Sequence, residues 1–86
     1  MGSRMMVMEV DNLMRIRMWR LMQLDRRIRS GDYPNCSSFA REIAELIGMA
    51  QPYDRKTIQR DIDFLRDQMR APVEYDQARK GYFYYD

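Results

Sequence analysis

Residues 54–69 read DRKTIQRDIDFLRDQM, and this stretch decides the fold because its apolar and polar residues separate at helical spacing. The apolar residues on that spacing are Ile58, Ile62, Leu65 and Met69. They share one stripe, which predicts a helix over about residues 54–70 with this stripe packed on a core. Asp54 is the predicted N-cap, because its carboxylate can accept free backbone N–H groups of the first turn and complements the helix dipole.

The opposite side of this helix is polar and carries no large aliphatic residue. Its members are Lys56, Gln59, Arg60, Asp63 and Asp67. The first two turns present Arg, Lys, Thr, Gln and Arg, side chains that can bond phosphates and read base edges in a DNA major groove. A solvated amphipathic helix has the same pattern, so the rest of the chain must decide between the two interpretations.

Composition limits the remaining function classes. A chain of 86 residues with 45% apolar content predicts one small domain with little volume for a deep substrate pocket. The absence of His and the single Cys36 remove His-based catalysis, Cys–His pairs and His/Cys zinc sites, so we expect neither an enzyme nor a cofactor. Asp61, Asp63 and Asp67 lie among arginines along one helix, which predicts surface charge compensation.

Cysteine usage and hydropathy indicate a cytoplasmic protein. The lone Cys36, interpreted as a half-buried filler, implies no disulfide framework, and no apolar run is long enough to span a bilayer. The net charge of +2 is mild, so the placement of the basic residues matters more than their sum. They cluster at residues 15–29, at residues 55–60 and at Arg79 and Lys80. For the first cluster, a solvated helix surface and a nucleic-acid contact both remain open.

The N-terminal third predicts a flexible lead-in over residues 1–10 and a helix over about residues 11–30, with Asp11 as its N-cap. The residues assigned to the core stripe are Met14, Met18, Leu21, Leu24 and Ile28. Ile16 and Trp19 lie off this stripe and form a second apolar patch. Two interpretations stay open for Trp19, packing against the lead-in or a partner interface, and on the second we expect a homodimer that uses Ile16 and Trp19.

The middle of the chain predicts a helix over about residues 38–47, capped by Ser37 or Ser38 and ended by Gly48. Its expected core residues are Phe39, Ile43 and Leu46. A turn then leads into the helix of residues 54–70. Two helices joined by a Gly-containing turn, the second with a polar outer face, form the helix-turn-helix pattern.

The C-terminal residues predict a β-hairpin over about residues 73–85. Ala71-Pro72 breaks the preceding helix, VEYD (73–76) alternates, and YFYY (82–85) is an aromatic strand. Gly81 is expected to supply a positive φ, with Arg79 and Lys80 at or near the tip. A hairpin directly after a recognition helix is the wing of a winged helix, which contacts the DNA backbone or minor groove through residues 77–81.

Four segments together resemble the N-terminal winged helix-turn-helix of bacterial WYL-domain transcriptional regulators, which are related to DeoR-type regulators. The segments are SGDYPNC (30–36), RKTIQRDIDFLRD (55–67), EYD (74–76) and RKGYFYYD (79–86). The resemblance covers about residues 15–86. It implies an α+β winged helix-turn-helix over residues 11–86 that binds operator DNA, usually as part of a dimer. A C-terminal WYL sensor domain is expected in the full-length protein, because the family continues where this chain stops.

The resemblance also assigns contacts by position. Those of the recognition helix are Arg55, Lys56, Thr57, Gln59 and Arg60, and those of the wing are Arg79 and Lys80. One departure is the turn GMAQPYD (48–54), which is longer than expected and leaves the angle of the next helix open. The prediction is sequence-specific binding of double-stranded DNA. The alternative is a winged helix that binds a protein, which normally shows an apolar outer face on its third helix; RNA binding ranks behind both.

Overall fold

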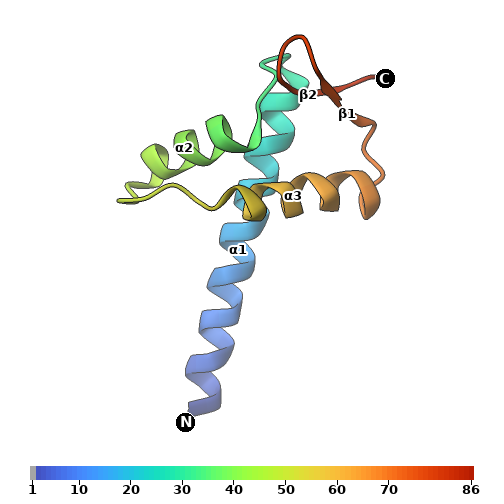
Figure 1. Ribbon diagram of the computed structural model, residues 1–86. Coiled ribbons are helices and arrows are strands. Elements are labelled where there is room, and N and C mark those ends of the chain that lie inside the picture. The colour runs from blue at the N-terminus through green and yellow to red at the C-terminus, as the bar shows by residue number, and fades with distance from the viewer. Residues whose placement is uncertain (1) are drawn as a thin grey trace.

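Three helices are followed by a two-stranded antiparallel hairpin in the computed structural model, which describes the backbone of residues 2–86 and the side chains from residue 12 onward. The elements are α1 (Gly2–Arg29), α2 (Cys36–Ile47), α3 (Arg55–Asp67), β1 (Val73–Asp76) and β2 (Gly81–Tyr84). The predicted α+β class is confirmed, and the order of elements is consistent with a winged-helix layout (Figure 1).

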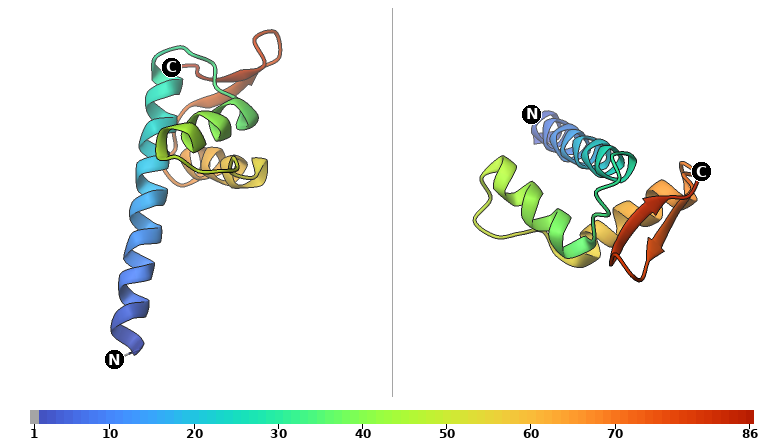
Figure 2. Two further views of the ribbon diagram at one scale, coloured as in Figure 1. Left: turned by 90° about the vertical axis from the view of Figure 1, so that its left-hand side faces the viewer. Right: turned by 90° about the horizontal axis from the view of Figure 1, so that it is seen from above.

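The elements gather around one half of the first helix. α2, α3 and the hairpin all lie beside the C-terminal half of α1, while its N-terminal half projects away from them (Figure 2). With 28 residues and a rise of ~1.5 Å per residue, α1 is ~42 Å long. This helix therefore accounts for most of the longest dimension of the molecule, which measures 52 × 30 × 20 Å.

The core lies where the three helices and β1 meet. Its largest contributors are Leu21, Leu24 and Ile28 of α1, Phe39 and Ile43 of α2, Ile58, Ile62 and Leu65 of α3, and Val73 of β1. Fully burying one such side chain contributes ~1.5–3 kcal/mol relative to leaving it exposed. Trp19, Tyr53, Phe64, Tyr82 and Tyr84 pack against the margin of this cluster. The helical spacing in the sequence predicted most of these positions.

Four residues assigned to the core are exposed instead. Met14, Met18, Leu46 and Met69 keep 60%, 54%, 60% and 61% of their surface accessible. Met14 comes before Arg17, the first α1 residue with a contact to α3, and Met18 lies at the rim of a groove that α1 shares with α3. Leu46 lies in the last turn of α2, and Met69 follows the end of α3. The helical spacing was right at these positions, but the helices extend beyond the core.

The start of the first helix also differs from the prediction. Residues 2–10 are helical, continuous with the rest of α1, so the expected lead-in over residues 1–10 and the cap at Asp11 are wrong for the described backbone. The physical reason is that residues 3–30 contain no Gly or Pro, while Met is a good helix former. A helix without an interrupting residue extends past the position where its core pattern begins.

Side chains at the N-termini fix where the other two helices begin. Asn35, rather than Ser37 or Ser38, caps α2: its Oδ1 accepts the Ser38 N–H at 2.8 Å, and Ser38 Oγ accepts the Asn35 N–H at 3.0 Å. This reciprocal pair is a capping box. Asp54 caps α3 as predicted, accepting the Lys56 N–H at 2.9 Å. Gly48 ends α2 with a φ of 72°, also as predicted.

A buried ion pair joins the first and third helices. Arg20 donates from Nε and Nη2 to the two carboxylate oxygens of Asp61, the second at 3.0 Å, and Asp61 is only 1% exposed. The expectation that Asp61 belongs to the surface charges is therefore wrong, because it lies on the side of α3 that faces α1. Tyr53, from the long turn before α3, has its ring 4.9 Å from the Arg20 guanidinium. The turn and the ion pair together hold α3 against α1.

The glycine of the hairpin has a different role from the one predicted. Lys80, not Gly81, has the positive φ, at 55°. A Cβ at Gly81 would lie 1.8 Å from the Tyr33 carbonyl oxygen, so Gly81 is required by close backbone approach. The same approach is held by hydrogen bonds from Tyr82 N–H to the Pro34 carbonyl at 2.8 Å and from Asn35 Nδ2 to the Lys80 carbonyl at 3.1 Å. The hairpin is thus docked onto the segment before α2.

Candidate nucleic-acid interface

The N-terminal half of α3 carries the predicted recognition residues. Arg55, Lys56 and Arg60 are exposed, while Thr57 and Gln59 are half-buried. The Asp54 cap fixes the first turn, where the free backbone N–H groups and the helix dipole add positive potential. This end of the helix therefore presents three cationic side chains to solvent.

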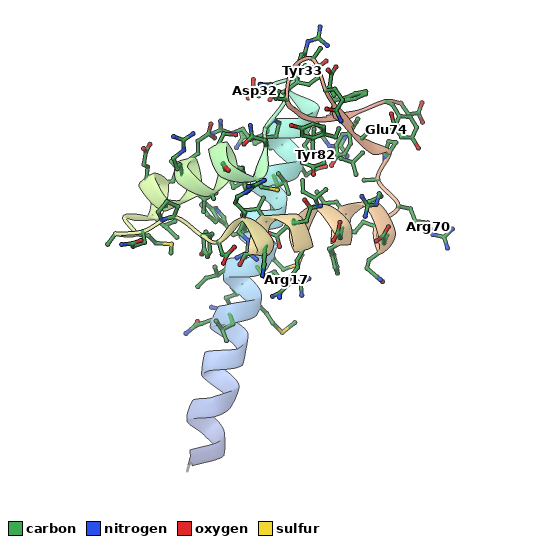
Figure 3. All side chains as sticks on the ribbon, viewed as in Figure 1. Arg17, Asp32, Tyr33, Arg70, Glu74 and Tyr82 are labelled. Carbon is green, nitrogen blue, oxygen red and sulfur yellow. The ribbon has the colours of Figure 1, made fainter. Side chains whose placement is uncertain are left out.

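A groove of about 540 Å³ lies between the first turns of α2, the N-terminal half of α3 and the hairpin. Each element contributes one basic side chain to it: Arg41 from α2, Arg55 from α3 and Lys80 from the hairpin. Tyr82, which also lines the groove, lies between the hairpin and the helices (Figure 3). The structure thus brings together residues that are as far apart in sequence as 41 and 80.

The floor of the groove is neutral and hydrogen-bonded. Gln59 Oε1 accepts from the Tyr82 hydroxyl at 3.2 Å and from the Cys36 thiol at 3.6 Å, while its Nε2 donates to Asp63 at 3.1 Å. Burial raises the pKa of the Cys36 thiol and the pKa of Tyr82 above their ordinary values, so both groups are protonated at neutral pH. Gln59 therefore supports the floor, and its amide is already engaged on both sides.

The cations near this groove are not neutralised by the protein. Among the side chains of residues 12–86, no carboxylate lies within 4.0 Å of the charged groups of Arg41, Arg55, Lys56, Arg60 or Lys80. The C-terminal half of α3 differs, because Arg66 pairs with Asp63 at 2.9 Å and with Asp67 at 3.1 Å. Positive charge is therefore concentrated at the groove and at the start of α3.

The two basic residues of the hairpin are held differently. Arg79 donates to the Tyr33 hydroxyl at 2.7 Å, lies 4.6 Å from the Tyr33 ring centroid and is 3.5 Å from the Asp76 carboxylate. Lys80 instead reaches the groove. Of the two predicted wing residues, Arg79 braces the hairpin against the segment before α2, and Lys80 is the one directed to the candidate interface.

Most of the arginines in the second half of α1 make contacts with other residues of the domain. The Arg17 guanidinium lies 4.8 Å from the Phe64 ring centroid, Arg20 pairs with Asp61, Arg27 bonds Glu42 at 2.7 Å, and Arg29 bonds Asp25 at 2.9 Å. Figure 3 shows Arg17 beside α3. For the basic cluster of residues 15–29, a solvated surface and a nucleic-acid contact were both open. These four arginines instead make contacts within the domain.

The predicted interface residues of α1 have unequal environments. Trp19 is half-buried and packs against the core of its own chain. Residues 2–10 continue helix α1 and form no separate lead-in. Ile16 is 44% exposed. A role for either residue in a partner interface stays a prediction.

Arg41 is the basic lining residue of the groove that the sequence did not predict. It follows Ser37 by four residues, so the two share one face of α2, and both line the groove. This i, i+4 spacing places Arg41 on the same face of α2 as the helix start. The sequence alone would identify Arg41 as a groove residue only if the side-by-side packing of α2 and α3 were also known.

Comparison of the chain with known protein families, with curated proteins and with solved structures finds no match. None of the described helices is both long enough and apolar enough to cross a membrane. The functional argument therefore depends on the groove, its charges and the helix beside it.

Proposed function

We propose that the protein binds double-stranded DNA in a sequence-specific manner, as the winged helix-turn-helix DNA-binding domain of a bacterial, cytoplasmic transcriptional regulator. The observation that carries the proposal is the group of cations around the groove and the start of α3 that have no carboxylate partner within the described part of the chain. Unneutralised cations on a small domain of mild net charge are suited to a polyanionic partner. A C-terminal WYL sensor domain in the full-length protein remains part of the proposal through the family resemblance alone.

In this proposal the N-terminal half of α3 enters the major groove, which is ~12 Å wide and admits an α-helix. Arg60 and Lys56 are exposed there and carry no ion pair with any side chain of residues 12–86, so their side chains are available to base edges. Arginine can bond guanine O6 and N7 with two parallel hydrogen bonds. Arg60 is therefore assigned to base reading, with Lys56 and Thr57 beside it.

Backbone phosphates fit the groove between α2, α3 and the hairpin. Arg41, Arg55 and Lys80 would bind a phosphate strand from three elements, fixing the distance of α3 from the duplex. Gln59 supports this arrangement from the floor, where it bonds Tyr82 and Cys36. Arg79 acts indirectly, because its contact with Tyr33 positions the turn that carries Lys80.

The alternative of a protein-binding winged helix is less well supported. Such a module would need an apolar outer face on α3, whereas the large apolar side chains of this helix are buried or half-buried and its exposed residues are charged. A protein partner for this surface would have to be strongly acidic. Duplex DNA satisfies the same charge requirement and also explains the hairpin beside the helix.

The test is a titration of duplex DNA, taken from a selection of bound sequences out of a random pool, at a series of salt concentrations. The log of the binding constant should fall linearly with the log of the salt concentration, by ~0.9 for each phosphate neutralised. Arg55→Ala should remove about one phosphate contact and so reduce the magnitude of that slope by ~0.9. The matched control is Arg70→Ala, which removes the same charge from the segment just after α3, where Figure 3 shows Arg70 pointing away from the body of the molecule.

Two results contradict the proposal. One is the absence of binding at low salt, and the other is binding whose affinity does not change with salt. Equal slopes for Arg55→Ala and Arg70→Ala would instead show that the groove between α2, α3 and the hairpin does not contact DNA.

A further inference from the structure

An aromatic wall forms part of the basic groove, which lies between α2, α3 and the hairpin and carries Arg41, Arg55 and Lys80. Tyr75 of β1 and Tyr82 of β2 form this wall as cross-strand neighbours, with their ring centroids 5.1 Å apart and their ring planes at 74°. Tyr75 keeps 42% of its surface exposed. Contact with a phosphate strand accounts for the cations, but it gives no role to this exposed ring.

The polar groups that remain free in the basic groove are mainly donors. The amide oxygen of Asn35 already accepts the Ser38 N–H at 2.8 Å, and that of Gln59 accepts the Tyr82 hydroxyl at 3.2 Å. The three basic side chains can only donate. Among the side chains of residues 12–86, no carboxylate lines the groove. A ligand of this groove is therefore expected to be an anion that is rich in acceptor atoms.

The dimensions of the basic groove suit a small molecule. Its volume of about 540 Å³ lies within the ~300–1,000 Å³ that small-molecule sites occupy. A DNA strand that crosses the groove presents phosphates and sugars, because its bases are paired and stacked inside the duplex. A free nucleotide presents an unstacked base and phosphates together. Proteins hold unpaired nucleotides with this combination, an aromatic ring for the base beside cations for the phosphates.

We propose that the basic groove binds a free nucleoside triphosphate, with the base stacked on Tyr75 and the phosphates among Arg41, Arg55 and Lys80. Cations from three elements can surround a triphosphate chain, which carries several negative charges. GTP is the best-suited member of this class, because the O6 and N7 edge of guanine offers only acceptors. The nucleotide occupies the space that the proposed function gives to the DNA backbone, so nucleotide and DNA compete. Nucleotide binding stands alone, while the competition rests on the proposed function.

The test is equilibrium dialysis of the full chain against GTP, without DNA and at low salt. The native chain should bind GTP at one saturable site. Tyr75→Ala should weaken that binding by roughly fivefold or more, because the loss of one base–aromatic contact has at least that effect. Binding of inorganic tripolyphosphate, which has no base, should change by less than about twofold in the same variant.

Three further variants separate the ring from the charges. Tyr75→Phe keeps the ring and should bind GTP as the native chain does. Arg55→Ala should weaken the binding of GTP and of tripolyphosphate alike, by roughly fivefold, because it removes a charge that both probes use. The matched control is Tyr85→Ala, which removes an exposed aromatic ring that does not line the groove and should leave the binding of both probes unchanged. The three positions are exposed, so the circular dichroism spectrum should match that of the native chain.

A competition experiment connects the nucleotide site to DNA. GTP should raise the apparent dissociation constant of the selected duplex. Binding of both ligands without competition would place the nucleotide outside the basic groove and overturn the proposal. The absence of saturable GTP binding, or equal losses of GTP and tripolyphosphate binding in Tyr75→Ala, would overturn it as well. A chain that binds GTP but not DNA contradicts the proposed function alone, whereas a chain that binds DNA but not GTP contradicts this inference alone.

Discussion

Two arginine-rich regions of the molecule use the same residue type for different purposes. In the C-terminal half of α1, Arg17, Arg20, Arg27 and Arg29 each have an aromatic or carboxylate partner. At the groove between α2, α3 and the hairpin, the basic side chains have no such partner among the side chains that the structure describes. The difference shows that clustering in the sequence does not identify a binding surface. The availability of intramolecular partners decides which cations remain free.

Each of these α1 arginines has a partner on an element that packs on this helix, and Arg29 also pairs with Asp25 of α1 itself. Arg17 and Arg20 contact α3, Arg27 contacts α2, and Arg29 lies 5.7 Å from the Tyr84 ring centroid on β2. These contacts connect α1 to every other layer of the domain. The walls of the basic groove instead offer hydroxyl, amide and thiol groups. Removal of an arginine should therefore affect folding in the first region and ligand binding in the second.

The largest expected effect comes from breaking the buried pair between Arg20 and Asp61. Asp61→Ala leaves a guanidinium buried without its carboxylate, which should lower the free energy of unfolding by ~3–5 kcal/mol. The measurement is urea denaturation followed by circular dichroism. The matched control is Asp67→Ala, which removes a carboxylate from the exposed end of the same helix and should cost much less.

A second variant tests whether the loss comes from the unpaired buried charge. The double replacement Arg20→Met with Asp61→Leu should recover much of the loss, because a buried ion pair is often replaceable by apolar side chains. An unfolding free energy for Asp61→Ala no lower than for Asp67→Ala would show that the pair does not stabilise the fold.

The next effect concerns the free cations. Arg60→Ala should cost ~1–3 kcal/mol in binding to the preferred DNA site and should relax the base preference at the position it contacts. Lys80→Ala should weaken binding to all sequences to a similar extent, since a phosphate contact carries no sequence information. Both variants should unfold at the same urea concentration as the native chain. The measurement is competition between the selected site and random duplex DNA.

Equal losses of Arg60→Ala on the two DNAs would assign Arg60 to the phosphate backbone. A lower unfolding free energy for Lys80→Ala than for the native chain would show that Lys80 also stabilises the fold. The basic groove would then resemble the α1 region in this respect.

The sequence predicted the features that depend on local spacing. Helical periodicity located Ile58, Ile62 and Leu65 in the core, and the cap at Asp54 and the stop at Gly48 follow from the chemistry of single residues. These features need no knowledge of which segments meet. The same is true of the hairpin, whose alternation and aromatic strand identify it directly.

Features that depend on distant contacts were not predictable in the same way. Asp61 resembles its exposed neighbours in sequence, and only Arg20, 41 residues away, makes it a buried partner. Gly81 was assigned to a positive φ, whereas the contact with Tyr33 is what excludes a side chain there. Arg41 reaches the basic groove only because α2 lies beside α3. The sequence predicts a DNA contact for Gln59, whereas the folded chain engages its amide with Tyr82 and Asp63.

The smallest expected effect tests one further contact of the α1 region at high pH. The Tyr84 hydroxyl donates to Asp25 at 2.6 Å, beside Arg29, and burial followed by the bond to Asp25 raises the pKa of Tyr84 above its ordinary value. A phenol whose pKa is raised by folding stabilises the native state fully below the unfolded pKa of about 10 and loses that contribution as the pH rises above it. Tyr84→Phe should therefore cost ~0.5–1.5 kcal/mol at neutral pH and progressively less above pH ~10. Urea denaturation at pH 7 and pH 10.5 measures this difference, with the exposed Tyr85→Phe as the matched control. If the two variants lose stability equally between these pH values, the bond between Tyr84 and Asp25 does not stabilise the contact of β2 with α1 in solution.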